Sequence, residues 1–276
     1  MDPVCYFLGD IGCLNKNLNE ITLKIEEKMQ LGDKIFLLGD NFYNHGICSQ
    51  DDPRWNLYKD LFKPLGYRNI YSAMGNHDYE GNPYVQLTSK YMMNTDFYYK
   101  YRFSLNTELF VLDTVQLYEN HCAIGLQDMI RVHNRTYREL EERQLNWLSR
   151  SLRESRCPNK VVIGHYPILS NGIYGDFLDP LYEKLMPIFE HHKVNVYISG
   201  HEHNAQFIEK LQSYHCFNQL IVGSSSECRA DDCEKIHNVS MYDNTDNFYL
   251  RMSERGRRLI FDYINKAGKI KYNYII

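Results

Sequence analysis

The chain has 276 residues, of which 43% are hydrophobic and 24% are charged, and this composition is typical of a soluble globular protein. The formal net charge of −4 offers no basic face to nucleic acid or to an anionic membrane, and no run of 18 apolar residues is present to span a bilayer. We therefore expect one monomeric domain over residues 1–276, with no nucleic-acid or membrane partner.

The start of the chain, MDPVCYFLGD, lacks the positive and apolar regions of a secretory signal and leads directly into a predicted core strand. The eight cysteines include no C-x-x-C pair, and in a chain of this length we expect free thiols. Both features favour a cytoplasmic protein.

The first third of the chain alternates strands and helices. Short apolar runs such as KIFLL predict strands, and apolar residues at near-helical spacing between charges predict helices. The predicted order is strand, helix, strand, helix, strand over 4–10, 17–31, 34–40, 53–62 and 69–78. This alternation is typical of a parallel sheet with crossover helices.

The pattern changes after this region. We expect an antiparallel strand pair over 97–103 and 108–115, then a polar surface insertion over 116–136. The next predicted elements are helix 137–155, strand 160–167, helix 180–192 with an interruption near Pro187, and strand 194–204. A run of β-strands and turns completes the chain.

Five predicted strands run into polar loops, with the sequences LGDIG, LGDNFY, MGNHD, IGHYP and SGHEH. In open α/β sheets, ligands bind beyond the carboxyl ends of the strands. If these ends share one edge, the loops gather eight oxygen or imidazole side chains: Asp10, Asp40, Tyr43, Asn76, His77, His165, His201 and His203. No cysteine is among them, so the set suits iron, zinc or manganese.

Electrostatics favours a metal centre over an empty pocket. Buried polar groups left unpaired cost roughly 1–3 kcal/mol each. Seven candidate ligands, which are the eight side chains without His77, exceed one tetrahedral site with an open position, and they divide well between two ions that share a carboxylate. Taken singly, each motif has an ordinary interpretation as a turn carboxylate, a surface histidine or a packing tyrosine. Five such motifs, each at a strand end, favour the metal interpretation.

The five blocks Asp-x-Gly, Gly-Asp-Asn-Phe-Tyr, Gly-Asn-His-Asp, Gly-His-Tyr-Pro and Gly-His-x-His resemble the signature of the purple acid phosphatases. These enzymes belong to the calcineurin-like metallophosphoesterase superfamily, and the chain is most similar to their small, single-domain, tartrate-resistant type. The resemblance implies an α/β fold, a four-layer α/β/β/α sandwich with mixed sheets.

The resemblance also implies a ligand set. It assigns Asp10, Tyr43 and His203 to a ferric ion and makes Asp40 the bridging ligand. A second ion, Fe(II), Zn(II) or Mn(II), takes the remaining three: Asn76, His165 and His201. Tyr43 is then a phenolate ligand, which suits a hard trivalent cation.

The implied activity is hydrolysis of phosphate monoesters by a two-metal mechanism with a metal-activated hydroxide. His77 is expected beside the phosphate as a hydrogen-bond donor or proton donor, and Asp78 either orients His77 or caps its own turn. Tyr174 occupies the position where tartrate-resistant relatives carry a second histidine. It either binds substrate in place of that histidine or only packs.

Other functions remain open from the sequence. The fold also suits a phosphodiesterase, a phosphoprotein phosphatase, or a metal-binding module without catalysis. Arg131, Arg135 and Arg138 form either a substrate-facing basic patch or a solvated helix start, and His121 and His133 are either near the site or on the surface.

Overall fold

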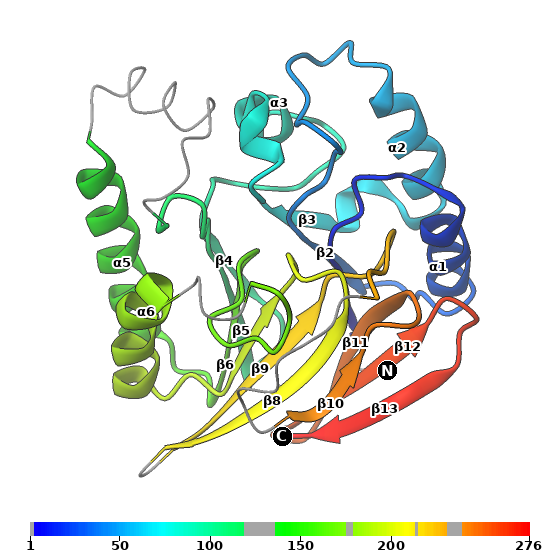
Figure 1. The fold of residues 1–276 in the computed structure, drawn as a ribbon. Coiled ribbons are helices and arrows are strands. Elements are labelled where there is room, and N and C mark those ends of the chain that lie inside the picture. Colours follow the sequence, from blue (N-terminus) through cyan, green and yellow to red (C-terminus); the bar gives the residue numbers. More distant parts are fainter. Residues whose placement is uncertain (1–2, 119–135, 175–178, 213–214, 231–238) are drawn as a thin grey trace.

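The computed structural model describes residues 3–118, 136–174, 179–212, 215–230 and 239–276. Figure 1 shows two β-sheets stacked between two groups of helices. The first sheet has the order β13-β12-β11-β1-β2-β3 and the second the order β10-β8-β9-β7-β6-β5-β4. Both sheets mix parallel and antiparallel pairs, which confirms the predicted mixed sandwich.

The first sheet joins the two ends of the chain. Its strands are β1 (Cys5–Leu8), β2 (Lys34–Leu38), β3 (Ile70–Ala73), β11 (Phe248–Arg255), β12 (Arg258–Asn265) and β13 (Ile270–Ile275). The strands β1, β2 and β3 are parallel, as their alternation with helices predicted. On its other edge β1 pairs antiparallel with β11, where Phe7 lies opposite Leu250.

The second sheet comes from the middle of the chain. Its strands are β4 (Tyr99–Arg102), β5 (Thr107–Val111), β6 (Asn159–Ile163), β7 (Val196–Ser199), β8 (Ala205–Gln212), β9 (His215–Val222) and β10 (Val239–Asp243). The predicted antiparallel pair is β4 with β5. The strands β5, β6, β7 and β9 are mutually parallel in the order β9-β7-β6-β5.

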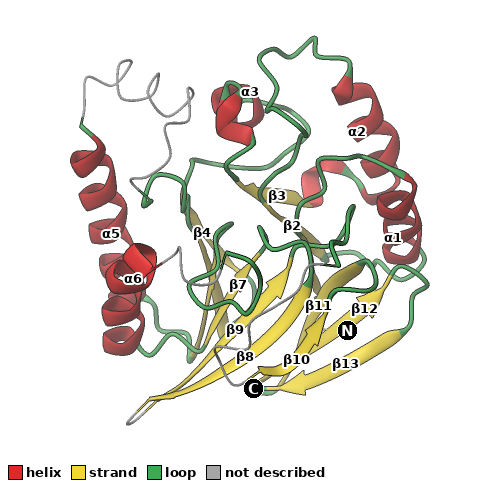
Figure 2. Ribbon diagram, in the orientation of Figure 1, coloured by secondary structure: helices red, strands yellow, loops and turns green. Residues whose placement is uncertain are grey.

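Helices cover the outer face of each sheet (Figure 2). The described helices are α1 (Lys16–Glu26), α2 (Arg54–Phe62), α3 (Pro83–Leu87), α5 (Tyr137–Glu154) and α6 (Asp179–His192). Short 3₁₀ turns occupy Lys63–Leu65, Tyr67–Asn69 and Asp78–Glu80. Among the described residues, no helix has the length and apolar character needed to cross a membrane.

Three apolar clusters hold the layers together, because successive strand residues point to opposite faces. Phe7 and Phe36 belong to the cluster between the sheets, where their rings stack with centroids 5.8 Å apart. Tyr6 and Ile35, their neighbours in the chain, belong to a second cluster with α1 and α2. A third cluster packs α5 and α6 on the second sheet. This arrangement is the expected four-layer α/β/β/α sandwich.

Helix boundaries follow local chemistry. Asn15 caps α1 by accepting a hydrogen bond from the Leu18 amide at 3.2 Å. The helix ends at Glu26 rather than at the predicted residue 31, because Leu31 is fully exposed and adds nothing to the buried stripe. At the start of α5, the Thr136 and Glu139 side chains form a reciprocal capping box.

The predicted interruption near Pro187 is wrong. α6 continues through Pro187, which lies on the exposed face of the helix, so the carbonyl left without its helical partner is near solvent. Helix α3 and strand β10 were not predicted from the sequence.

Of the predicted insertion over 116–136, residues 119–135 lie outside the described part of the chain. Gln116, Leu117 and Tyr118 are buried. His121, His133, Arg131 and Arg135 also lie outside it. Arg138 is described: it is exposed and pairs with Glu142 at 2.9 Å within α5, as a solvated helix start would. Five cysteines of the described chain are free thiols: Cys5, Cys13, Cys48, Cys157 and Cys228.

Candidate metal centre

The loops that follow β1, β2, β3, β6 and β7 meet beyond the carboxyl ends of these strands. Figure 2 shows the loops gathered at the centre of the molecule. Two backbone approaches make this possible. Gly39 has φ +93°, and a Cβ there would lie 2.6 Å from His165 Nδ1. A Cβ at Gly200 would lie 2.5 Å from the carboxylate of Asp10. Only glycine lets the loops come this close.

Asp10 and Asp40 are both buried and both have left-handed backbones, with φ of 57° and 53°. Asp10 accepts a hydrogen bond from the amide of His201 at 2.8 Å, and Asp40 accepts one from the amide of His77 at 3.0 Å. Each carboxylate is thus fixed by the loop of another strand. The amide bonds use Asp10 Oδ2 and Asp40 Oδ1, and the other oxygen of each carboxylate lies near the Tyr43 hydroxyl.

The hydroxyl of Tyr43 lies among three polar atoms. It is 3.0 Å from Asp10 Oδ1, 3.2 Å from Asp40 Oδ2 and 3.0 Å from His203 Nε2. A phenol carries one proton, so it can donate to only one of these three groups at a time. The other two groups then point lone pairs at the phenol oxygen with no proton between them. A cation at this point would remove that repulsion.

A second convergence lies around His165. Its Nδ1 is 2.9 Å from the carbonyl of Leu38, which can only accept, so the ring proton resides on Nδ1. Burial lowers the pKa of His165 to about 4, and its Nε2 is therefore a bare lone pair at neutral pH. That atom lies 3.0 Å from Asn76 Oδ1 and 3.5 Å from Asp40 Oδ1. Three electron-rich atoms again face one point.

The pKa values also show that the charged forms of these side chains are unfavourable in the metal-free site. Burial and the neighbouring Asp40 raise the pKa of Asp10 well above its ordinary value, and burial raises that of Asp40 to about 6. Burial lowers the pKa of His203 to about 3. Burial and the two carboxylates also raise the pKa of the Tyr43 phenol. A bound cation reverses the trends of the two carboxylates and the phenol by favouring their charged forms, and it favours the same neutral form of His203 that burial favours.

The residues present therefore fit a metal centre. Ligand atoms of Asp10, Asp40 and His165 all lie within 4.8 Å of one another, and all three residues are buried. His203 Nε2 faces the same point, 3.0 Å from the Tyr43 hydroxyl and 3.6 Å from Asp10 Oδ1, while its Nδ1 lies 3.7 Å from Glu227 Oε2. The donor set is oxygen and imidazole nitrogen, which suits iron, zinc and manganese.

His201 and Tyr174 lie on the more open side of this centre. The ring of His201 packs against those of His165, Tyr166 and Tyr174, with centroids 5.1, 4.6 and 4.5 Å away. Both His201 and Tyr174 are half-buried. The predicted site residue Tyr174 is therefore in contact with a candidate ligand.

His77 stands beside the centre and is half-buried. Its Nδ1 donates to the carbonyl of Asn44, and its Nε2 lies 3.9 Å from Asp40 Oδ2. Asp78 does not orient this ring: its carboxylate accepts from the amides of Asn41 and Gly75 and from the side chain of Gln86. The turn-capping alternative is the one that the structure supports.

Two positioning residues escaped the sequence analysis. Glu202 is buried and accepts from the Ser170 hydroxyl at 2.7 Å and the Tyr174 amide at 3.1 Å, so it holds the loop that carries Tyr174. Ser226 donates its hydroxyl to the carbonyl of Asp10. The available signals were the acidic residue inside GHEH and the serine run GSSS after a predicted strand.

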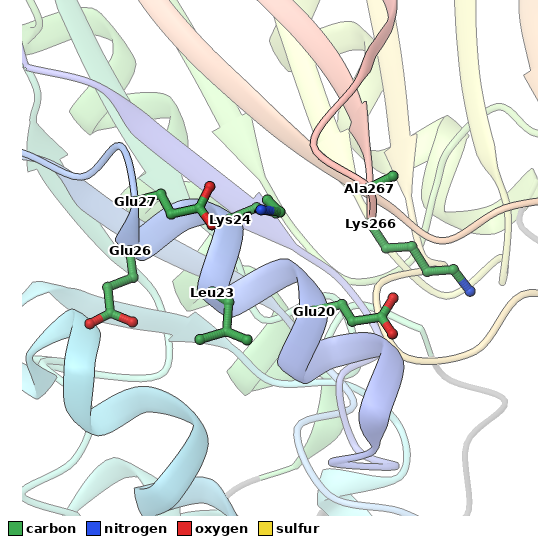
Figure 3. A pocket seen from close by; sticks show the side chains of 7 residues that line it. All are labelled: Glu20, Leu23, Lys24, Glu26, Glu27, Lys266 and Ala267. Atoms are coloured by element: carbon green, nitrogen blue, oxygen red, sulfur yellow. Dashed lines mark hydrogen bonds and ion pairs between the residues drawn. The ribbon is translucent and has the colours of Figure 1, made fainter.

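A hollow elsewhere on the surface takes no part in this centre. It measures about 530 Å³ and lies between α1 and the turn after β12 (Figure 3). Its lining is Glu20, Leu23, Lys24, Glu26, Glu27, Lys266 and Ala267. Charges of both signs line it, and none of the predicted site residues does.

Fold and site together define a phosphoesterase of the calcineurin type. The family model described as "Calcineurin-like phosphoesterase" matches residues 5–205, and the chain belongs to this family.

The chain is similar to tartrate-resistant acid phosphatase type 5 of Sus scrofa, with 33% identity over 64% of this chain and 54% of that protein. It is 29% identical to purple acid phosphatase 3 of Arabidopsis thaliana, over 92% of this chain and 72% of that protein. These matches bear out the resemblance to purple acid phosphatases. The chain spans about half the length of the tartrate-resistant relatives it matches.

The fold also matches a solved structure described as "GAP50 the anchor in the inner membrane complex of Plasmodium". The TM-score is 0.78 with 21% identity, and the match covers 98% of this chain and 87% of that chain. At this identity the match speaks for the fold alone.

Proposed function

We propose that the chain is a metal-dependent phosphatase that hydrolyses phosphate monoesters. The observation that carries this proposal is the double convergence of lone pairs, around the Tyr43 hydroxyl and around His165 Nε2. A pair of cations is the simplest way to stabilise both at neutral pH. The names of the relatives add weight to a phosphatase reaction.

The ligand set that we propose has two halves joined by Asp40. Trivalent iron is held by Asp10, Tyr43 and His203, and Fe(II), Zn(II) or Mn(II) by Asn76, His165 and His201. The phenol of Tyr43 is the feature that favours the trivalent ion, because it is the hardest oxygen ligand in the set. Bound there, the two cations would supply Lewis-acid charge and lower the pKa of a water molecule.

The chain itself contributes orientation and proton handling. The Nδ1 of His77 is committed to the carbonyl of Asn44, which turns Nε2 toward Asp40 and the centre. We assign this Nε2 to the phosphate, as a hydrogen-bond donor or as the atom that passes a proton to the leaving oxygen. Tyr174, packed on His201, is proposed to line the substrate entrance with its hydroxyl as a donor.

The test uses purified protein, metal analysis and two substrates. We expect about two metal equivalents including iron, a violet band from the phenolate, and faster turnover of p-nitrophenyl phosphate than of bis(p-nitrophenyl) phosphate. Faster turnover of the diester would instead identify a phosphodiesterase. Colourless protein that binds no metal and turns over neither substrate would refute the proposal and favour a non-catalytic scaffold.

A further inference from the structure

Arg54, the first residue of α2, contacts the loop that carries Tyr43 although it lies outside every block discussed above. We propose that Arg54 is a positioning residue for the site: its guanidinium fixes the loop 43–46 and thereby places both the Tyr43 phenol and the His77 ring. This inference rests on the proposed function for its catalytic consequence, but not for its structural one.

The Asp52 carboxylate orients the Arg54 guanidinium by pairing with one of its edges. Its Nε donates to Asp52 Oδ1 at 2.9 Å and its Nη2 donates to Asp52 Oδ2 at 2.7 Å. The same carboxylate accepts the Arg54 amide at 2.9 Å. Arg54 in turn lowers the pKa of Asp52 through these hydrogen bonds. A two-pronged pair of this kind fixes the plane of the guanidinium.

The other edge of the guanidinium donates hydrogen bonds to backbone carbonyls of the loop. Nη1 donates to the carbonyls of Tyr43, at 3.2 Å, and His45, and Nη2 lies 3.4 Å from that of Gly46. These residues belong to neither a helix nor a strand, so regular secondary structure does not satisfy their carbonyls. A single permanently charged side chain therefore gathers three carbonyls of one turn.

Between these carbonyls, that of Asn44 is left for His77. Nδ1 of His77 donates to it, and the amide of Gly46 donates to the carbonyl of His77 at 2.6 Å. The His77 and Tyr43 rings also meet nearly at right angles, with centroids 4.9 Å apart. Any shift of the loop moves the phenol and the imidazole together, and a 1 Å misplacement of a catalytic group costs up to about a hundredfold in rate.

The variants are Arg54→Ala, Arg54→Lys and, as a matched control, Arg68→Ala. Arg68 is exposed, and the described structure gives its side chain no hydrogen bond or ion pair. The first measurement is amide hydrogen exchange of residues 41–47 in the folded protein. We expect about tenfold faster exchange in Arg54→Ala, unchanged exchange in α5, and no change in the control.

The second measurement separates kcat from KM. We expect kcat to fall at least about tenfold in Arg54→Ala with KM within about twofold, because substrate contacts persist while catalytic groups are misplaced. Arg54→Lys keeps the positive charge but loses the planar guanidinium that pairs with Asp52 at two points, so it is expected to restore kcat only in part. The violet band should broaden or shift in Arg54→Ala at equal iron content.

A lower melting temperature with unchanged local exchange and unchanged kcat would show a merely structural role and overturn the proposal. Full activity in Arg54→Lys would overturn the claim that the planar guanidinium is needed. If the unmodified protein lacks phosphatase activity while Arg54→Ala still accelerates exchange in 41–47, the proposed function fails and the positioning role stands.

Discussion

The two halves of the candidate metal centre differ in their access to solvent. We call Asp10, Tyr43 and His203 the first cluster, and Asn76, His165 and His201 the second cluster. In the first, Asp10 is fully buried and His203 is 6% exposed, with Tyr43 half-buried over them. In the second, only His165 is fully buried, and Asn76 and His201 are half-buried.

This difference in solvent access suggests that one cluster retains its metal ion and the other binds the substrate. A closed cluster with two acidic oxygens holds a cation tightly, since leaving would uncover buried charge. A more open cluster leaves room for a substrate oxygen. We therefore expect the first cluster to keep its ion through purification and the second to exchange its ion with the medium.

The largest effect is expected where the clusters join. Asp40 approaches both Tyr43 and His165, so Asp40→Ala should release both ions and lower turnover more than about a thousandfold. Metal analysis and p-nitrophenyl phosphate turnover measure this. Asp60→Ala, at an exposed carboxylate on α2, is the control. Retention of two ions in Asp40→Ala would contradict the joined arrangement.

Tyr43→Phe should affect the first cluster alone. It removes the hydroxyl that lies 3.0 Å from both Asp10 and His203. We expect loss of the violet band, weaker iron retention and about a hundredfold lower kcat, while added Zn(II) still binds the second cluster. Tyr101→Phe, on β4, is the control. A violet band that survives Tyr43→Phe would remove the tyrosine from the ligand set.

Removal of the metal ions should make the stability of the protein depend on pH through Asp40, the residue that joins the two clusters. Burial raises the pKa of Asp40 from its ordinary 3.8 to about 6. In the metal-free protein this contributes stability that is fully present below pH 3.8 and is lost as pH rises through about 6, a change of about 3 kcal/mol. A bound cation replaces the proton and cancels that loss.

The affinity of the second cluster for a divalent ion such as Zn(II) should therefore rise with pH, by up to about tenfold per unit below about pH 6, and the contribution of Asp40 should then level off. Iron binding in the first cluster should continue to gain with pH, because burial also raises the pKa values of Asp10 and Tyr43. The pKa values of His165 and His203, about 4 and about 3, leave both rings neutral over most of the range between about pH 4 and 6. The measurement is the difference in melting temperature between loaded and metal-free protein at several pH values. A difference that does not change with pH would be inconsistent with a buried Asp40 ligand.

The smallest effect is expected at Tyr174, at the edge of the second cluster. Tyr174→Phe keeps the ring against His201 and removes only the hydroxyl, so kcat should fall by a few-fold, about 1 kcal/mol. Tyr174→His should move the activity optimum toward acid pH, because imidazole is the side chain suited to exchange protons between acid and neutral pH. Unchanged kcat and pH profile in both variants would leave packing as the role of this ring.

The sequence allowed us to predict β1, β2 and β3 and the loops that follow them, because strand, turn and polar residue lie within a few positions of one another. It did not reveal Glu202 or Ser226 as positioning residues. Ser226 reaches Asp10 across 216 positions, a contact that no local spacing encodes. For the same reason, nothing in the predicted helix 53–62 singled out Arg54.

The pairing of β1 with β11 has a consequence for how the site is made. The family match ends at residue 205, yet β11 borders β1, and Ser225 and Ser226 bond the amide of Gly9 and the carbonyl of Asp10. During synthesis on the ribosome, the first metal-binding loop must therefore wait for the last quarter of the chain to emerge. A gene fragment cut to the matched segment would be expected to yield an incomplete, aggregation-prone sheet.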